Sequence, residues 1–372
     1  NRFFRGASLK IKVIPNFDII TFYSYNKIDA NITDTLEGEE LTYSSLQNSG
    51  MHRTENELSD KNAIKQQNFG IHTNYKIGKV NWGISYINNT TFGTIDRNLG
   101  TSNQFDLDSN KNSVVSTDYQ YLYRNFNFFG EIGRSENGGT AQLHGVLIGL
   151  DKTLSASFMF RDYDREFQNN YSNSFAESKT QNEKGFYSGV EFKPNLNWKF
   201  RSYIDLYQYP WLRHSSNTPT IGTDFFIQSD YKINRNTKIY FRYKNEKKEE
   251  NTNIEYDNSP IIEIQKKEGW RFNSIFKEGE NWTFKNRIEI SKVQKNSVTE
   301  NGFMFYQDVK YKPLFSKLSF SVRYTFFNTE SYNSRIYAYE SDVLYGYSIP
   351  SFYGKGKKIY FLLKYNIIKN AD

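Results

Sequence analysis

The sequence predicts an all-β protein, and more specifically a transmembrane antiparallel up-and-down β-barrel. Three observations point to this class: apolar and polar residues alternate with period two along most of the chain, 17% of residues are aromatic, and the connections alternate between short and long. Helical periodicity is nearly absent, and no segment approaches the roughly 18 apolar residues of a membrane-spanning helix. Spanning β-strands of about 9–11 residues alternate between lipid and water, so a low mean hydropathy of −0.75 is compatible with them.

The alternation is clearest near the end of the chain, where Leu318, Phe320 and Val322 share one face of a predicted strand and Ser321 and Arg323 take the other. The same pattern predicts about 18 strands, most of them long enough to cross a bilayer at a tilt. They lie near 6–14, 17–27, 67–77, 80–90, 116–124, 127–134, 140–150, 153–164, 184–193, 197–209, 222–233, 237–246, 261–276, 282–294, 302–311, 318–328, 335–348 and 357–368.

The connections separate a barrel from a soluble sandwich or propeller, which has no reason to sort its loops by length. Tight turns follow the odd-numbered strands, at Pro15-Asn16, Gly78-Lys79, Asp151-Lys152, Pro194-Asn195 and Asn234-Arg235-Asn236. A barrel of the bacterial outer membrane has short periplasmic turns and long extracellular loops. We therefore expect one barrel domain over 1–372 in the outer membrane of a Gram-negative bacterium, with long extracellular loops near 28–66, 91–115, 165–183, 210–221 and 247–260.

Strand parity also bears on completeness. If the tight turns are periplasmic, the eighteenth predicted strand ends on the extracellular side, whereas a complete barrel normally ends on the periplasmic side. This predicts that strands are missing at the C-terminus, and we expect the same at the N-terminus.

Three tryptophans, Trp82, Trp198 and Trp282, each follow a tight turn at the start of a strand. Indole rings prefer the lipid headgroup layer, because one edge is apolar and the N–H group can donate a hydrogen bond. We expect them to be membrane-interface aromatics on the periplasmic side; the alternative is that they cap the core of a soluble sheet.

No constellation of residues indicates catalysis. The four histidines are far apart, cysteine is absent, and no metal-binding, nucleotide-binding or nucleophile motif occurs. We expect no enzyme activity, no cofactor and no metal. A hydrolase of lipid or surface polymer built on the barrel is an alternative that the spacing of Ser, His and acidic residues does not favour.

Basic residues outnumber acidic ones on the predicted lumen face. Rings of Lys and Arg favour anions in a pore, but the same residues could instead pair with acidic groups of a plug or loop, and the sequence leaves both open. The basic residues concerned are Lys10, Lys12, Lys76, Arg124, Arg161, Lys199, Arg201, Arg242, Lys244, Lys285, Arg287 and Arg323.

The 28–66 connection is too long for a simple loop and contains a helix-capping pattern. Thr54 and Glu57 have the spacing of a capping box, and Leu58 and Ile64 would lie near one side of a short helix. With His52 and Arg53, these residues predict an extracellular loop helix that folds over the pore or docks a surface partner; a merely solubilising loop is the alternative.

Several phrases resemble a family of large outer-membrane barrel proteins that carry an N-terminal helix-hairpin-helix segment, often labelled competence-type. They are "NRFFRGASLKIK" (1–12), "SGMHRTENELSDKNAIKQQNFG" (49–70), "NEKGFYSGVEF" (182–192), "YPWLRHSSNTPTIGTDFFIQSDYK" (209–232), "IYFRYK" (239–244) and "SRIYAYESDVLYGYSIPSFYGKGKKIYFLLKY" (334–365). The resemblance implies further barrel strands on both sides of this region. The helix-hairpin-helix segment, which contacts DNA elsewhere, is not in this sequence, so the residues present do not support nucleic-acid binding.

Together these features predict an outer-membrane, porin-like barrel that acts as a channel favouring anionic species, or as a scaffold component of a surface or secretion complex. Its expected partners are outer-membrane lipid and other outer-membrane or surface proteins. A soluble β-rich adhesin is the remaining alternative.

Overall fold

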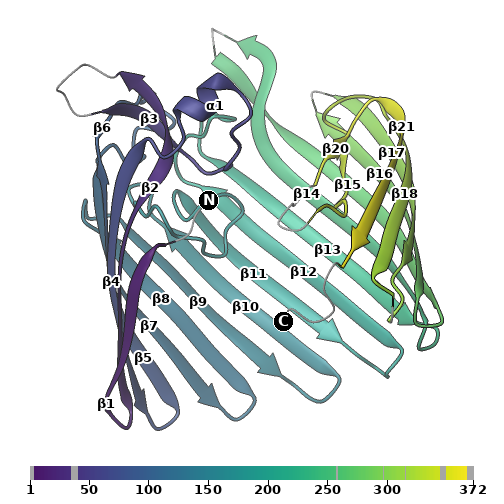
Figure 1. Cartoon of the computed structure of the whole chain (residues 1–372), viewed down its shortest axis with the longest axis horizontal. Coiled ribbons are helices and arrows are strands. Elements are labelled where there is room, and N and C mark those ends of the chain that lie inside the picture. Colours follow the sequence, from purple (N-terminus) through teal and green to yellow (C-terminus); the bar gives the residue numbers. More distant parts are fainter. Residues whose placement is uncertain are drawn as a thin grey trace. The chain divides into compact units, whose positions relative to one another are not determined.

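The computed structural model of the chain describes residues 4–34, 41–256, 259–295, 297–314, 316–343 and 349–366. Strand accounts for 68% of the structure and helix for 1%. In these residues 19 strands belong to one sheet, in which the long strands run antiparallel to their neighbours. Figure 1 shows successive strands alternating in direction, as in an up-and-down arrangement. The predicted fold class, a transmembrane antiparallel up-and-down barrel, is confirmed.

The chain divides into two compact units. Unit 1 comprises Asn1–Ile148, Ser157–Phe186 and Tyr207–Thr220, and unit 2 comprises Gly149–Ala156, Tyr187–Leu206 and Ile221–Asp372. The first elements are β1 (Gly6–Ile14), β2 (Phe17–Asp34), β3 (Thr42–Gln47), α1 (Glu55–Ser59), β4 (Ile64–Ile77), β5 (Val80–Phe92), β6 (Thr94–Ile95), β7 (Lys111–Tyr123), β8 (Phe126–Ser135) and β9 (Thr140–Gly149).

Five strands have residues in both units. Two of them have a single end residue in the other unit: Gly149 of β9 lies in unit 2, and Thr220, which begins the strand after β12, lies in unit 1. Three strands are divided more evenly, and all residues after Thr220 lie in unit 2. These three are β10 (Leu154–Tyr163), β11 (Glu183–Phe192) and β12 (Trp198–Tyr209). The later elements are β13 (Thr220–Lys232), β14 (Thr237–Tyr256), β15 (Ser259–Glu278), β16 (Trp282–Lys295), β17 (Val298–Tyr311), β18 (Leu318–Thr329), β19 (Ile336–Tyr337), β20 (Ser351–Phe352) and β21 (Lys355–Tyr365).

All five predicted tight turns occur, and within each unit they lie at one end of the strands (Figure 1). The long loop predicted near 247–260 is wrong. β14 and β15 instead continue their pairing, so that Asn251 lies opposite Ile262. Lysines and glutamates support this extension: Lys248 and Lys295 lie 2.9 and 3.2 Å from the Glu250 carboxylate. Charge therefore stabilises strand where the sequence analysis took it as a sign of loop.

The strand predicted at 335–348 is also wrong. Only Ile336–Tyr337 is strand within 335–343, and 344–348 lie outside the described residues. β18 pairs directly with β21, placing Leu318 opposite Tyr365. β21 therefore ends beside the tight-turn end of β18, and the parity argument for missing C-terminal strands loses its premise.

One face of the sheet is apolar and exposed. Directly opposed residues of an antiparallel pair point to the same side, and Phe272, Ile288 and Phe305 follow one another in this way across β15, β16 and β17. A soluble protein would bury such a face, whereas a bilayer covers it. Large side chains on this face that are between 40% and 62% exposed include Leu9, Ile11, Val13, Trp82, Ile84, Val115 and Ile132 in unit 1, and Val190, Ile204, Phe241, Phe272, Ile288, Ile290, Phe361 and Leu363 in unit 2.

The two faces predict opposite tolerance for charge. Ile84→Lys places an ammonium on the apolar face of β5 and should destabilise the membrane-inserted fold by about 2–4 kcal/mol. Asn74→Lys, on the other face of β4, should change stability much less, because Asn74 shares that face with Gly83 and Asp118. Urea unfolding of both variants in lipid vesicles measures the difference. Equal destabilisation would show that the exposed apolar face does not contact lipid.

Candidate functional site: the polar face and its inserted loops

The opposite face of the sheet, called the polar face below, carries amides, hydroxyls and charges. In unit 1 it is largely uncharged where it is buried: Asn68, Asn89 and Asn112 are at most 5% exposed. In unit 2 it is densely charged, with Arg287 and Arg323 buried among carboxylates. Buried polar groups need partners, and in both units a loop packed on the sheet supplies some of them.

In unit 1 that loop is the segment 164–182 between β10 and β11, called loop A. The Tyr171 hydroxyl donates to Gln66 Oε1 at 2.6 Å, and Asn170 Nδ2 donates to Asn89 Oδ1 at 3.2 Å. Asn112 Nδ2 donates to a loop A carbonyl, that of Gln168, at 3.1 Å. The buried amides of the sheet thus hold loop A by hydrogen bonds and not by charge.

A buried ion pair fixes the end of loop A. Arg161 Nε donates to Glu183 Oε1 at 2.6 Å, and their side chains are 1% and 0% exposed. The Glu183 carboxylate also accepts from the backbone N–H groups of Glu177 at 3.0 Å and Ser178 at 3.2 Å. A buried carboxylate with this many donors is well compensated, so Glu183 ties β10, β11 and loop A together.

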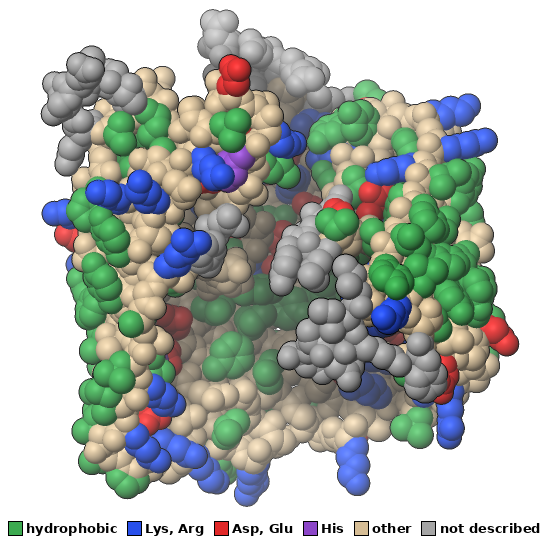
Figure 2. Space-filling model, viewed as in Figure 1, with side chains coloured by type: hydrophobic (Ala, Val, Ile, Leu, Met, Phe, Trp, Pro, Cys, Tyr) green, Lys and Arg blue, Asp and Glu red, His purple; other side chains and the backbone are tan. Residues whose placement is uncertain are grey.

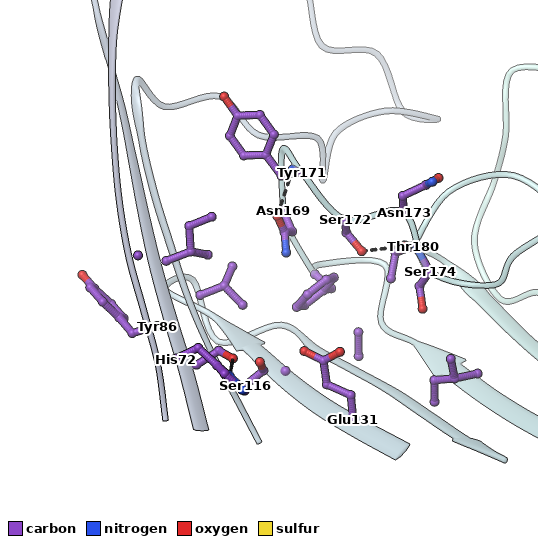
Figure 3. Close-up of a pocket in the computed structure, with 18 of the residues that line it drawn as sticks. His72, Tyr86, Ser116, Glu131, Asn169, Tyr171, Ser172, Asn173, Ser174 and Thr180 are labelled. Atoms are coloured by element: carbon purple, nitrogen blue, oxygen red, sulfur yellow. Dashed lines mark hydrogen bonds between the residues drawn. The ribbon is translucent and has the colours of Figure 1, made fainter. Parts of the chain in front are cut away.

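Between loop A and the sheet lies a cavity of about 460 Å³. Figure 3 shows His72, Ser116 and Glu131 rising into it from the strands, while Asn169, Ser172, Asn173, Ser174 and Thr180 approach from loop A. Ser172 Oγ donates to Thr180 Oγ1 at 2.8 Å. These hydroxyl and amide groups share the lining with apolar side chains such as Phe22, Val114 and Leu143, an arrangement suited to a small solute held by a few hydrogen bonds.

The strands bring one Ser, His and Asp together on this face, which the spacing in sequence does not indicate. Both Ser85 Oγ (2.9 Å) and Asp118 Oδ2 (3.9 Å) approach the same ring nitrogen of His72, Nδ1. A nucleophile–base–acid relay needs the serine and the carboxylate on opposite nitrogens of the imidazole. This triplet therefore does not support the hydrolase alternative.

In unit 2 the polar face is covered by the segment 330–354, called loop B, of which 344–348 lie outside the described residues. Arg287 Nη2 donates to the carbonyl of Tyr337 at 3.0 Å, and Arg323 Nη1 donates to that of Tyr339 at 2.5 Å. Lys358 on β21 lies 2.7 Å from the Glu340 carboxylate. Basic side chains of the sheet thus hold loop B by binding both its backbone carbonyl groups and the carboxylate of Glu340.

An apolar cluster completes the docking of loop B. Met304 and Tyr306 of β17 pack against Ile336, Ala338 and Phe352 of the loop, all of them at most 3% exposed. Because the loop is extended where it lies on the sheet, alternate side chains point into the contact. This explains why its sequence has the period of a spanning strand.

Most of the predicted basic lumen residues lie on the polar face and have partners. Arg161, Arg287 and Arg323 hold the inserted loops. Four others pair with carboxylates: Lys10 with Asp18 (3.4 Å), Lys199 with Glu191 (2.5 Å), Arg201 with Asp230 (2.7 Å) and Lys244 with Asp224 (2.9 Å).

The remaining basic residues differ from one another. Arg242 Nε donates to Gln228 Oε1 at 2.8 Å, and Lys285 Nζ lies 5.9 Å from the Tyr306 ring centroid. Lys12 and Lys76 are exposed. The assignment of Arg124 to a strand is wrong: it occupies the turn between β7 and β8 with a φ of 52°, and its guanidinium lies over the ring of Tyr123.

The three tryptophans lie at the tight-turn ends of strands on the apolar face. Trp82 Nε1 donates to Thr117 Oγ1 at 2.7 Å. Trp198 stacks on Tyr231 with ring centroids 4.4 Å apart, and Trp282 lies 4.6 Å from Tyr311. In Figure 2, hydrophobic side chains gather over the strands at the right, and Lys and Arg side chains project from the lower edge, where the tight turns lie.

The helix predicted in the 28–66 connection is present as α1. Thr54 is its N-cap and accepts a hydrogen bond from the Glu57 N–H at 3.2 Å, while Glu57 accepts from the Arg53 N–H and guanidinium at 2.6 and 2.8 Å. His52 Nε2 lies 2.8 Å from Asp29. Ile64 is not part of the helix: it begins β4 and is buried with Tyr43 and Ala30.

Sequence reasoning missed the residues that hold the loops. Asn68, Asn89 and Asn112 are uncharged, whereas the prediction of lumen residues rested on charged side chains. Glu183 lies at the edge of a predicted loop. The three asparagines fall on the polar face of β4, β5 and β7, and this position was a usable signal. Amides on that face need a hydrogen-bond partner when they are buried.

Alternating faces, strands of spanning length and an exposed apolar face together place the chain in the bacterial outer membrane, where antiparallel β-strands span the bilayer. Within the described residues, no helix is long and apolar enough to cross a membrane.

No protein-family model matches the sequence, and no curated protein matches it. Similar solved structures include OccK5 (OpdH) of Pseudomonas aeruginosa, with 9% identity and a TM-score of 0.39 over 81% of this chain and 92% of that one. An anion-selective porin from Comamonas acidovorans has 10% identity and a TM-score of 0.41 over 97% and 98%. OmpT of Vibrio cholerae has 9% identity and a TM-score of 0.40 over 94% and 99%. At these values the matches assign neither a solute nor a selectivity to this chain, and the helix-hairpin-helix family stays a resemblance.

The Glu183 carboxylate should decide whether loop A stays docked. Glu183→Ala leaves the Arg161 guanidinium buried without its carboxylate and should cost about 3–5 kcal/mol. It should also let trypsin cleave after Lys179, because loop A would no longer be held against the sheet. Lys184→Ala, which removes a half-exposed pair with Asp162, is the matched control and should cost at most about 1 kcal/mol. Limited proteolysis in micelles compares the two; identical cleavage would refute the anchoring role.

The cap of α1 should respond to acid. The Arg53 guanidinium and N–H hold the pKa of Glu57 at about 2, below its ordinary value of 4.5. A carboxylate with a lowered pKa stabilises the fold fully above its unfolded pKa and loses this effect as the pH falls through its folded pKa. We therefore expect α1 amides to keep their hydrogen-exchange protection at pH 5 and to lose it progressively from about pH 4.5 toward 2. Arg53→Gln should shift that loss to higher pH; an unchanged profile would contradict the pairing.

Proposed function

We propose that the chain is an outer-membrane β-barrel protein whose polar face borders a water-filled passage, narrowed in each unit by an inserted loop. The observation that carries this proposal is the contrast between the faces. One exposes large apolar side chains, and the other buries arginines, carboxylates and amides under loops A and B. A merely structural barrel could fill that face with apolar residues, whereas a hydrated passage favours polar ones.

The charges of the polar face support only a modest preference for anions. Most of its arginines and several lysines are paired with carboxylates, so they add little net field. The exposed lysines Lys12 and Lys76, with Lys152, Lys232 and Lys238 at the tight-turn ends of unit 2, supply the excess positive charge. Rings of such residues favour anions, so the proposed passage is weakly and not strictly anion-selective.

A scaffold function is the second candidate, and the β14–β15 hairpin favours it. The strands of this hairpin are 20 residues each, about twice the length needed to span a bilayer. Ile264, near the far end of β15, is 60% exposed. The part of the hairpin that extends beyond the bilayer provides a long surface on which a partner could dock.

Planar-bilayer recording of the full protein tests the passage. The wild type should conduct, with a reversal potential that indicates modest anion preference. Arg287→Gln with Arg323→Gln removes both donors to the loop B carbonyls and should raise the conductance severalfold as the loop leaves the polar face.

The matched control for this experiment is Lys312→Gln, a change in an exposed turn of the same unit. It should leave the conductance unchanged. Absence of conductance in all three proteins, each inserted in the bilayer, would refute the passage and favour the scaffold.

A further inference from the structure

A second cavity, of about 790 Å³, lies in unit 2 at the tight-turn ends of its strands. Six cationic side chains line it. Four of them stand on the polar face of β12, β13 and β14, and the other two lie in the tight turns. The six are Lys152, Lys193, Lys199, Arg201, Lys232 and Lys238. Its size falls in the range of small-molecule sites, about 300–1,000 Å³.

Few carboxylates accompany these cations. Asp230 pairs with Arg201 at 2.7 Å, and the adjacent Glu191 is shared by Lys193 and Lys199 at 2.5 Å each. Two carboxylates therefore face six cations. This differs from the buried part of the same face, where two carboxylates face three arginines: Arg271 and Arg287 share Glu289, and Arg323 pairs with Asp308.

Three lysines of the cavity, Lys152, Lys232 and Lys238, make no ion pair within the part of the chain that the structure describes. Two of these are directly opposed: Lys232 on β13 lies opposite Lys238 on β14, on the same face. Like charges in that position destabilise a strand pair. An anion bound between them would relieve the repulsion.

Arg201 adds a further donor. Its Nη2 binds Asp230, but its Nε is buried and has no hydrogen-bond partner within the described residues. A buried donor without an acceptor carries a desolvation cost. An oxyanion in this cavity would supply an acceptor to Arg201 and negative charge to the lysines at once.

We propose that this cavity binds multiply charged oxyanions of the phosphate class, such as pyrophosphate or a phosphate ester. Lysines bind such groups as point charges, and several of them around one anion produce affinity that falls steeply with salt. The site deepens the proposed function, because it would select the anions that enter the passage from the tight-turn end. The binding step itself does not depend on conduction.

Calorimetric titration of the full protein in neutral detergent with pyrophosphate tests the site. We expect saturable binding that weakens with added salt, and a dissociation constant about tenfold or more higher in the Lys232→Gln, Lys238→Gln double variant. Lys312→Gln, outside the cavity, is the control and should bind as the wild type does. Equal affinity in all three proteins, or no saturable binding, would overturn the proposal.

Two further arms identify the source of the anion and separate this proposal from the passage. Nanodiscs containing phosphatidylglycerol should not compete with pyrophosphate if the site takes soluble anions; competition would assign it to lipid headgroups and refute entry of solutes. Pyrophosphate should block current from the tight-turn side only. Binding without any current would retain the site and reject the passage, whereas current without binding would do the reverse.

Discussion

The backbone of every spanning strand must find its hydrogen-bond partners on neighbouring strands, because a bilayer offers none. β15 and β16 meet this requirement without a break from Lys266–Gln294 to Glu278–Trp282. Uninterrupted pairing allows no slip of register, so each residue is committed to lipid or to the polar face for the whole strand. The exposed Phe272 and the paired Arg271, adjacent in sequence, show how sharply one residue separates the two environments.

A polar face under a packed loop creates a second requirement, since each covered group must be compensated. The two units meet it differently. Unit 1 uses amides, whose hydrogen bonds to Tyr171 and Asn170 need no charge, together with the buried pair of Arg161 and Glu183. Unit 2 uses arginines that bind a carboxylate and a loop carbonyl together, as Arg323 does with Asp308 and Tyr339. A planar guanidinium has several donors in fixed directions, which suits this double task.

The predictability of each feature follows from the range of the interaction behind it. Period-two alternation is local, so most strands and all five tight turns could be predicted from the sequence. The extended loop B has the same local pattern, and only its contact with Met304 and Tyr306, distant in sequence, distinguishes it from a spanning strand. For the same reason the basic residues were found but their partners were not. Glu340 and the carbonyl of Tyr337 reach Lys358 and Arg287 only through the fold of loop B.

The distribution of arginine and lysine adds a last distinction. Arg161, Arg287 and Arg323 are buried on the polar face away from the tight turns, where geometry decides whether a charge is tolerated. Lys152, Lys232 and Lys238 stand at strand ends near the tight turns, where a flexible and strongly hydrated ammonium keeps its water. The charges of the buried arginines are therefore neutralised by partners within the protein. The hydrated lysines at the strand ends remain able to bind a charged solute. Because both populations alternate with apolar residues in the same way, a count of basic residues on the polar face overstates the field that a passing anion would meet.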